Sequence, residues 1–295
     1  MAIGGYRFRR SFGNVSSRFR GARPDTYPVF TGILDDYPGA AAAYSLRALS
    51  AAWLAGDVVE VRRSSDSSTQ SFTAGQVADG TLEAFCGAGD GFVSTWYDQS
   101  GNGNDATQAT TTAQPKIVSA GALVTDAQGN AALKFDGNDD YLGCGARVVE
   151  LSQNAATVFA VSQQDGGTVN LPGYICSEGD SVSPYSSNFI FGGDNGEEVL
   201  WVNTAEFGTG GAGLRLESFL YDQANFQAYV NGATSGAAGA ATVNAETSNT
   251  VIGASGDGTT ANSARKITAL ISYKSDQSAN IAGIHSAIND LYSIF

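Results

Sequence analysis

The sequence has little cysteine and histidine and no long apolar run. Its three cysteines, Cys86, Cys144 and Cys176, are too widely spaced for a disulfide framework or a metal motif, so we expect free thiols. The single histidine, His285, has no second histidine or cysteine nearby, so we predict no Ser-His-Asp triad or metal site around it and expect a surface or rim position. No 18 consecutive residues are apolar, so no membrane span is predicted.

The first ten residues, MAIGGYRFRR, have a basic start without the apolar segment of a Sec signal. We therefore expect a protein that is made and folded in a cytoplasm.

Positive charge is scarce and unevenly placed. The chain has 16 Lys and Arg against 29 Asp and Glu, for a net charge of −13. The first 24 residues contain no acid and six arginines: Arg7, Arg9, Arg10, Arg18, Arg20 and Arg23. The remaining residues therefore carry −19, which should repel nucleic acid and anionic membranes, whereas the basic segment can bind phosphate or an acidic protein surface.

Residues 1–38 show no helical period and little alternation, but they interleave the arginines with Tyr6, Phe8, Phe12 and Phe19. We interpret them as an extended docking arm that becomes ordered on a partner, because a solvated tail has no use for four aromatic rings. The alternative is a frayed terminus. Residues 39–295 are predicted to form one domain.

Thirty-seven glycines and many small polar residues separate short alternating or β-branched runs, as in turn-rich all-β proteins. Ten such runs predict a two-sheet antiparallel sandwich. They begin near residues 58, 92, 131, 157, 188, 198, 214, 226, 250 and 266. Residues 232–245 are predicted to be a long loop or a weak strand.

Two segments have helical spacing. Residues 40–56 place Ala42, Leu46, Leu49 and Trp53 on one face and end at Gly56, which predicts an amphipathic helix. The isoleucines and the leucine of residues 281–291 predict a short terminal helix that packs through an apolar stripe.

Residues 46–109 resemble the start of the catalytic domain of α-L-arabinofuranosidase B, glycoside hydrolase family 54 (GH54). The resemblance rests on short matches at residues 47–49, 72–75, 78–79 and 85–86, and above all on Tyr-Asp-Gln-Ser-Gly-Asn-Gly-Asn at residues 97–104. Residues 133–142, 228–232 and 251–253 are similar to concanavalin A-like, or laminin G-like, jelly rolls. The resemblance implies a single jelly-roll sandwich with a few short helices after the arm.

The resemblance bears on catalysis as well. The family's acid/base aspartate matches Asp257, but its nucleophile, a glutamate in an Asp-x-Glu-Asn run, has no counterpart in this sequence. Glu197, Glu198 and Glu206 are the nearest acids in order. The family has two adjacent cysteines at the positions of Ile175 and Cys176, so only one of these thiols remains here. The family also has a cysteine at the position of Gly91 that forms a disulfide with the cysteine matching Cys86, and that disulfide is therefore lost. We therefore expect no arabinofuranosidase activity.

Other candidate residues have two readings each. Asp136, Asp139 and Asp140 either cradle Ca²⁺ or form a solvated turn. Residues 97–104 are either a structural turn in which Asp98 binds loop amides or a sugar site. Trp96 and Trp201 either stack on a sugar or lie in the core. Asp257 completes the candidate carbohydrate-binding set; no other cofactor is predicted.

A sandwich of carbohydrate-binding type without a signal or disulfides, behind a docking arm, fits a virion structural protein of a tailed bacteriophage. Similar modules are familiar in phage tail fibres and head decorations. We expect the arm to hold other virion proteins, the sandwich to adhere to host surface glycans, and the chain to form a homo-oligomer, most simply a trimer in a fibre. The alternatives are a glycoside hydrolase resembling arabinofuranosidase B and a free lectin module.

Overall fold

A computed structural model describes residues 30–164, 174–179, 187–192, 198–202, 205–209, 213–244, 248–254, 256 and 263–295. The chain divides after Phe30, and Thr31–Phe295 form one compact unit. The six arginines of the predicted arm lie outside the described residues. Residues 31–38, which we had expected in the arm, belong to the compact unit: helix α1 (Ile33–Asp36) buries Ile33.

Strands make up most of the described chain. They are β1 (Ala42–Ser45), β2 (Asp57–Arg63), β3 (Thr69–Thr73), β4 (Gly91–Trp96), β5 (Ala106–Thr107), β6 (Lys116–Ser119), β7 (Ala122–Leu123), β8 (Leu133–Lys134), β9 (Leu142–Cys144), β10 (Ala156–Gln164), β11 (Cys176–Gly179), β12 (Ser187–Phe191), β13 (Glu198–Val202), β14 (Ala205–Thr209), β15 (Leu214–Tyr221), β16 (Phe226–Val230), β17 (Ala233–Gly239), β18 (Val251–Ile252) and β19 (Arg265–Tyr273). The other helices are η1 (Ala51–Trp53), α2 (Ala74–Ala78), α3 (Thr81–Cys86), η2 (Thr111–Ala113) and α4 (Ile281–Tyr292). All ten predicted strands are confirmed. Of the two alternatives left open for residues 232–245, a long loop or a weak strand, the structure has the strand β17.

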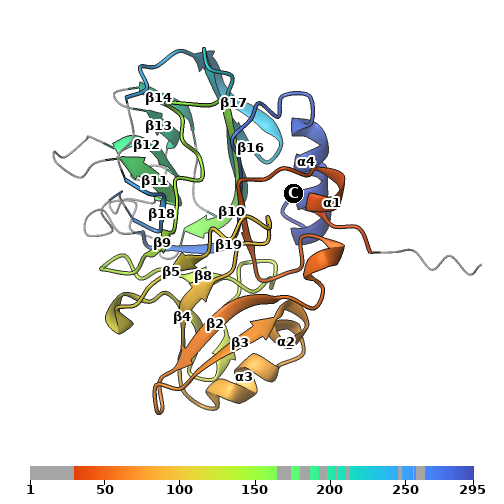
Figure 1. The fold of residues 1–295 in the computed structure, drawn as a ribbon, viewed down its shortest axis with the longest axis vertical. Helices are drawn as coiled ribbons and strands as arrows, with labels where there is room; N and C mark the ends of the chain where they lie inside the picture. Colours follow the sequence, from red (N-terminus) through yellow and green to blue (C-terminus); the bar gives the residue numbers. More distant parts are fainter. Residues whose placement is uncertain are drawn as a thin grey trace, which may run out of the picture. The chain divides into compact units, whose positions relative to one another are not determined.

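The strands form two antiparallel runs. One has the order β1-β19-β10-β15-β16-β17, and the other has the order β14-β13-β12-β11-β18-β9-β5-β4-β2-β3. β6 and β8 connect the runs, since β6 pairs with β4 and β8 pairs with β19. In Figure 1, β11 to β14 lie on one side of β10 and α4 lies on the other. The predicted all-β, jelly-roll-like sandwich with a few short helices is confirmed.

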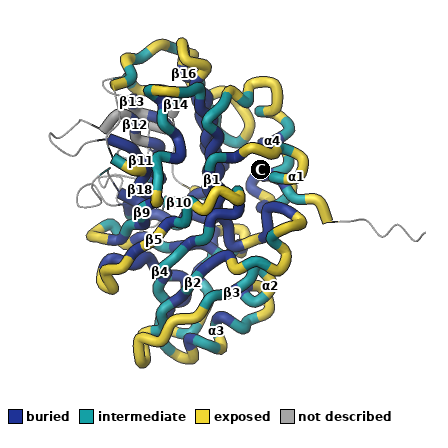
Figure 2. The backbone as a smooth tube through the Cα atoms, in the orientation of Figure 1, coloured by how far each residue is buried: buried dark blue, intermediate teal, exposed yellow. Residues whose placement is uncertain are grey.

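Apolar residues of both runs of strands form one buried cluster. The buried residues are the dark blue parts of the backbone in Figure 2. Phe219 of β15 contacts Phe189 and Phe191 of β12 with ring centroids 5.7 and 5.3 Å apart. Both runs therefore bury one face in the same core, as a sandwich requires.

A second core lies under the terminal helix. Ile284, Ile288 and Tyr292 of α4 pack with Phe159, Ile271 and Tyr273 of the strands beneath. The apolar stripe predicted for this helix is confirmed as its buried face.

His285 is buried, not at the surface or rim as we had expected. Only 4% of it is exposed, because its ring fits between Phe159 and Tyr229 and its Nε2 lies 2.7 Å from Ser218 Oγ. Burial lowers the pKa of the imidazole to about 4, so His285 is neutral at pH 7. It is a packing residue of the second core.

The helix predicted over residues 40–56 is wrong. This segment forms β1, whose residues are all buried and pair with β19, followed by the single turn η1. A strand buried on both faces is apolar at nearly every position, so its pattern also contains residues at helical spacing. Pairing with β19 stabilises this segment as a strand in place of the predicted helix.

Helices α2 and α3 were not predicted from the sequence. Thr73 and Gln76 form a reciprocal cap at the start of α2, with Oγ1 of Thr73 accepting from the Gln76 amide at 3.3 Å and Oε1 of Gln76 accepting from the Thr73 amide at 3.0 Å. This Thr-x-x-Gln signature was readable in the sequence. Within the described residues, no helix is long and apolar enough to cross a bilayer.

Candidate functional site

The loop at residues 97–104 is a structural turn. Asp98 is 2% exposed, and its carboxylate accepts hydrogen bonds from the amides of Ala43, Ser100 and Asn104 at 2.9, 2.8 and 3.0 Å and from the Ser100 hydroxyl at 2.7 Å. Gln99, also buried, accepts from the Leu49 amide at 2.9 Å. The loop therefore binds the segment that contains β1, and the prediction that Asp98 contacts sugar is wrong because its lone pairs are already used.

Trp96 and Trp201 are the two tryptophans that could stack on a sugar according to the sequence. Trp96 is fully buried beside Tyr44, with ring centroids 5.6 Å apart, so its expected role in sugar stacking is wrong. Trp201 lies in β13 opposite Glu206 in the register, and its side chain is outside the described residues. Asp257 is also outside the described residues, so the roles predicted for Trp201 and Asp257 stay predictions.

Asp136, Asp139 and Asp140 do come together. One carboxylate oxygen of each lies within 4.8 Å of the others, and Asp140 is buried while the other two are exposed. The carboxylate of Asp140 accepts from the Asp136 amide at 3.0 Å, and that of Asp136 accepts from the amide of Asn138 at 2.8 Å. The tight turn Phe-Asp-Gly-Asn-Asp-Asp at residues 135–140 therefore brings its three aspartates close together.

These acids border a pocket of about 240 Å³, and sequence reasoning missed its other walls. Its lining residues are Phe92, Thr112, Gln114, Lys116, Ser119, Lys134, Asp136 and Asp140. Lys116 is held to Asp90 by a 2.8 Å ion pair. Only Lys134, directly before the acidic turn, could have been found from the sequence.

The pKa values of the two acids that line the pocket are shifted in opposite directions. Burial, reinforced by the charges of Asp136 and Asp139, raises the pKa of Asp140 to about 7. Burial also acts on Asp136, but hydrogen bonds from Asn138 and from backbone amides outweigh it and lower its pKa. At pH 6, Asp136 is therefore ionised while most Asp140 is protonated.

An all-oxygen set of three carboxylates suits a hard cation such as Ca²⁺. Asp136, Asp139 and Asp140 would be the protein ligands, and the cation would offset the repulsion that raises the pKa of Asp140. Calcium binding stays a prediction.

The raised pKa of Asp140 predicts that the stability of the folded chain depends on pH when a metal chelator is present. Because the pKa of Asp140 is higher in the folded chain (about 7) than in the unfolded chain (3.8), the folded state binds the extra proton and stability falls as pH rises from about 4 to 7. Asp136→Asn removes a neighbouring charge, so we expect it to reduce that fall by about 1 to 2 kcal/mol. Urea unfolding at pH 5 and pH 8 measures it. The exposed Asp290→Asn is the control, and equal pH slopes in wild type and Asp136→Asn would contradict the assignment.

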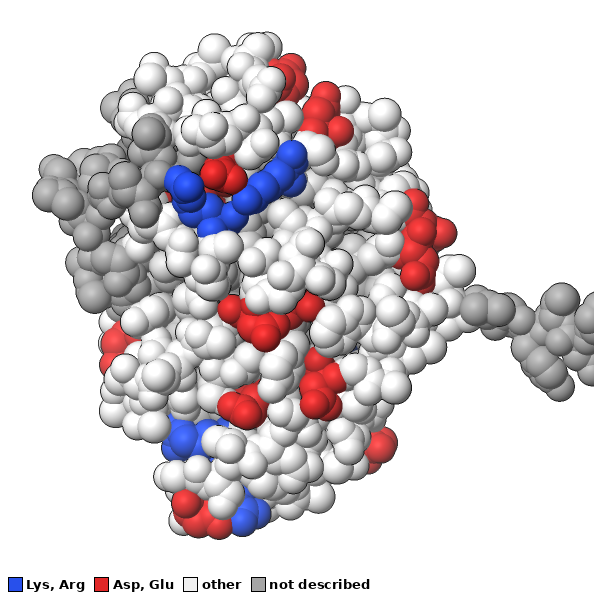
Figure 3. Space-filling model, in the orientation of Figure 1, with Lys and Arg blue, Asp and Glu red and all other residues white. Residues whose placement is uncertain are grey.

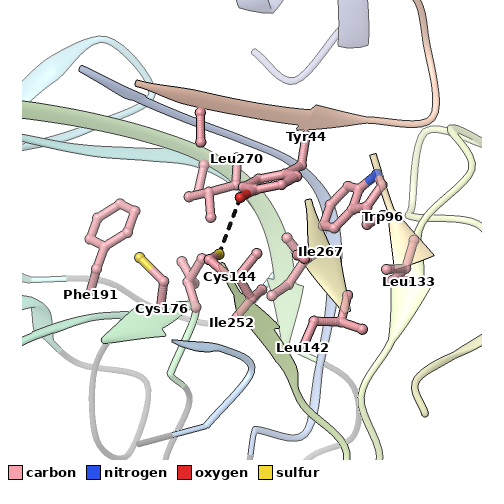
Figure 4. Close-up of a cluster of buried hydrophobic side chains, with 14 of the residues drawn as sticks. Tyr44, Trp96, Leu133, Leu142, Cys144, Cys176, Phe191, Ile252, Ile267 and Leu270 are labelled. Carbon is pink, nitrogen blue, oxygen red and sulfur yellow. Dashed lines mark hydrogen bonds between the residues drawn. The ribbon is translucent and has the colours of Figure 1, made fainter. Parts of the chain in front are cut away.

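The three cysteines are buried free thiols, as predicted. Burial raises the pKa of Cys86 to about 11 and that of Cys144 to about 12, so neither is a thiolate at pH 7. Figure 4 shows Cys144 and Cys176 among core side chains, with the Tyr44 hydroxyl donating to Cys144 Sγ at 3.1 Å. These thiols are packing residues.

The surface of the compact unit carries acids in several separate patches and few basic groups on the face drawn in Figure 3. One of its ion-pair networks joins Glu150 to Arg147 at 3.3 Å and to Lys274 at 2.8 Å. The acidic character expected for the body of the protein is visible on this face.

Comparison with known proteins supports the resemblance seen in the sequence. The family model "Alpha-L-arabinofuranosidase B, catalytic" matches residues 34–176. No curated protein sequence matches the chain.

Solved structures of similar fold include arabinofuranosidases, some of them GH54 enzymes. A mutant GH54 enzyme soaked with 4-nitrophenyl α-L-arabinofuranoside matches 89% of this chain with a TM-score of 0.68 and 16% identity. An arabinofuranosidase in complex with arabinofuranosyl-α-1,2-xylobiose also matches 89% of this chain, with a TM-score of 0.58 and 16% identity. This chain covers 66% and 65% of those two proteins, respectively. The compact unit therefore has a GH54-like β-sandwich fold and resembles the catalytic domain of α-L-arabinofuranosidase B.

Proposed function

We propose that this protein is a glycan-binding domain that uses a GH54-like sandwich to recognise arabinofuranosyl groups. The observation that carries the proposal is the fold match to the arabinofuranosidase soaked with an arabinofuranoside, which extends over 89% of the chain. The family model at residues 34–176 supports the same substrate class independently of that match.

Hydrolysis is not part of the proposal. A retaining glycosidase needs a nucleophile and an acid/base carboxyl about 5 to 5.5 Å apart. Asp257 matches the acid/base position in sequence, but no Asp-x-Glu-Asn run supplies the nucleophile. Binding without turnover is what this residue set supports.

Calorimetric titration of the full chain with a neutral arabinofuranosyl oligosaccharide tests the binding. We expect saturable binding and none to a cello-oligosaccharide. Trp201→Ala should weaken the affinity at least fivefold if this side chain stacks on the sugar. The control is Trp53→Ala, a partly exposed tryptophan at η1. Failure to bind any arabinofuranosyl glycan would end the proposal.

We expect the protein to leave 4-nitrophenyl α-L-arabinofuranoside intact, because the nucleophile motif is missing. Release of nitrophenolate over hours at high enzyme concentration is the measurement. Turnover that disappears in Asp257→Asn would show that the protein is a glycoside hydrolase and would correct the binding-only proposal.

A second candidate, a structural virion protein of a tailed bacteriophage, is supported by the composition of the N-terminal segment. Its six arginines and four aromatics, with no acid before Asp25, have the makeup of interface hot spots. Deleting residues 2–24 should leave the compact unit folded, because that unit begins at Thr31, and should abolish incorporation into particles. Normal incorporation of the truncated chain would remove the docking role.

A further inference from the structure

Unpartnered buried polar atoms are concentrated in one place. Among the described residues, seven buried side-chain nitrogen or oxygen atoms have no hydrogen-bond partner, and only Trp96 Nε1 lies elsewhere. Five of the other six belong to four residues at or next to the ends of β10, β15 and β19: Gln164, Arg215, Ser263 and Arg265. The sixth, Oε1 of Glu217 in the middle of β15, has no hydrogen bond of good geometry but lies 3.0 Å from Arg215 Nη2 in an ion pair. Buried polar groups are normally paired, so such a concentration needs a physical explanation.

Four of these residues, Gln164, Arg215, Glu217 and Arg265, share one face of three adjacent strands. Gln164 is opposite Arg265 in the β10–β19 register, and Ser162 is opposite Arg215 in the β10–β15 register. Glu217 lies two residues beyond Arg215 and therefore points to the same side as Arg215. Phe219, two residues further, packs on the opposite layer, so this is the inner face of the sandwich.

The charges in this cluster do not balance. Glu217 lies 3.0 Å from Arg215 Nη2 and 2.9 Å from Arg265 Nη1, so one carboxylate faces two guanidinium groups. The exposed fractions of these side chains are 7% for Arg215, 1% for Arg265 and zero for Glu217. Burial, together with repulsion from Arg265, lowers the pKa of Arg215 against the attraction of Glu217. A buried positive charge that lacks a counter-charge is unfavourable.

The free donors of Arg265 have a specific geometry. Its Nη1 donates to Ser162 Oγ at 2.8 Å and to Glu217 at 2.9 Å. Its Nε and Nη2 have no hydrogen-bond partner in the part of the chain that the structure describes. These two nitrogens form one edge of the planar guanidinium and point their N–H bonds in parallel, which matches the two oxygens of a carboxylate.

We propose that this cluster binds the carboxylate of an acidic sugar, such as a uronic acid, side-on at Arg265. The bound anion neutralises the excess charge of the two arginines and accepts from the two free donors of Arg265. Arg215 Nε is a further unpartnered donor on the same face. The inference rests on the proposed function of glycan recognition and specifies that the glycan contains an acidic residue.

The test is calorimetric titration of the full chain with sodium glucuronate, with glucose and sodium chloride as reference ligands at equal sodium concentration. We expect glucuronate to bind, and glucose and chloride to bind at least tenfold more weakly. Chloride binding equal to that of glucuronate would mean an adventitious ion only, and glucuronate binding no tighter than glucose would likewise overturn the proposal.

Substitutions assign the binding to the cluster. Arg265→Lys keeps the charge but loses the paired donors, so we expect at least a tenfold loss of glucuronate affinity. Glu217→Gln removes the competing carboxylate and should strengthen glucuronate binding, a change that a purely structural role does not produce. Arg147→Lys, in the surface ion pair with Glu150, is the matched control and should leave the affinity unchanged. If Arg265→Lys does not fold, the sign of the Glu217→Gln effect decides the matter, and weaker or unchanged binding overturns the proposal.

The two proposals fail in different ways. If neutral arabinofuranosyl oligosaccharides bind and glucuronate does not, the acidic-sugar inference is wrong while glycan recognition stands. If glucuronate binds with the expected variant pattern but no oligosaccharide does, the anion site stands and glycan recognition is wrong.

Discussion

Asp98→Ala is expected to lower the free energy of unfolding by about 3 to 5 kcal/mol. The substitution removes the acceptor of three backbone amides, those of Ala43, Ser100 and Asn104, and leaves them without a partner in a site where Asp98 was 2% exposed. Because Ala43 belongs to β1, the loss also weakens the attachment of the 97–104 loop to the sheet. Urea unfolding followed by circular dichroism at pH 7 measures the change.

Two further variants control this prediction. Asp98→Asn keeps one acceptor oxygen and should fall between the wild type and Asp98→Ala. Asp290→Ala changes an exposed acid on α4 and should stay within about 0.5 kcal/mol of the wild type. If Asp98→Ala is as stable as Asp290→Ala, the loop does not depend on its carboxylate and a ligand-binding role for Asp98 returns.

Gly253→Ala is expected to cost about 3 kcal/mol or more. Gly253 has φ +87°, where an L side chain is strained, and a Cβ there would lie 2.3 Å from Cδ1 of the fully buried Phe135. The residue cannot shift freely, because its amide donates to Ile175 and its carbonyl accepts from the Ser263 amide. Thermal unfolding should show a midpoint several degrees lower.

Gly143→Ala is the matched control on the neighbouring strand β9. The nearest atom to a Cβ at that position is the Thr107 carbonyl oxygen at 3.9 Å, so we expect a change below about 1 kcal/mol. Combining Gly253→Ala with Phe135→Leu should recover part of the loss, because the smaller side chain makes room. Equal effects at Gly253 and Gly143 would contradict the contact with Phe135.

Local sequence pattern is sufficient to predict most of the strands and the terminal helix α4. Short runs such as those of β2, β15 and β19 are bounded by Gly, Asn and Asp, and this local chemistry is sufficient to place them. The stripe of α4 was equally clear because a helix with one buried face has a 3.6-residue period. The resemblance to arabinofuranosidase B rested on the same local information, in the motif at residues 97–104.

The roles of the polar and aromatic side chains depend on tertiary contacts. Trp96 and Asp98 have the residue types of a sugar site, but pairing of the loop with the β1 segment buries both. His285 looked peripheral until packing of α4 on β15 enclosed it. Burial depends on contacts between residues far apart in sequence, which no local pattern contains.

Dependence on long-range contacts also explains why the burial of Arg215 and Arg265 could not be predicted from the sequence. In the sequence, Arg215 and Arg265 are ordinary charged residues at the starts of two apolar strands. Arg215 and Glu217 lie two residues apart on β15, so the sequence alone places them on one face. Only the registers of β10 with β15 and with β19 bring Arg265 to Glu217, and they leave the Nε and Nη2 donors of Arg265 without partners among the described residues. Local sequence pattern determines which elements form, because it sets backbone preference and amphipathic period. The pairing of those elements determines which charges meet in the core, because it sets the distances between residues far apart in the chain.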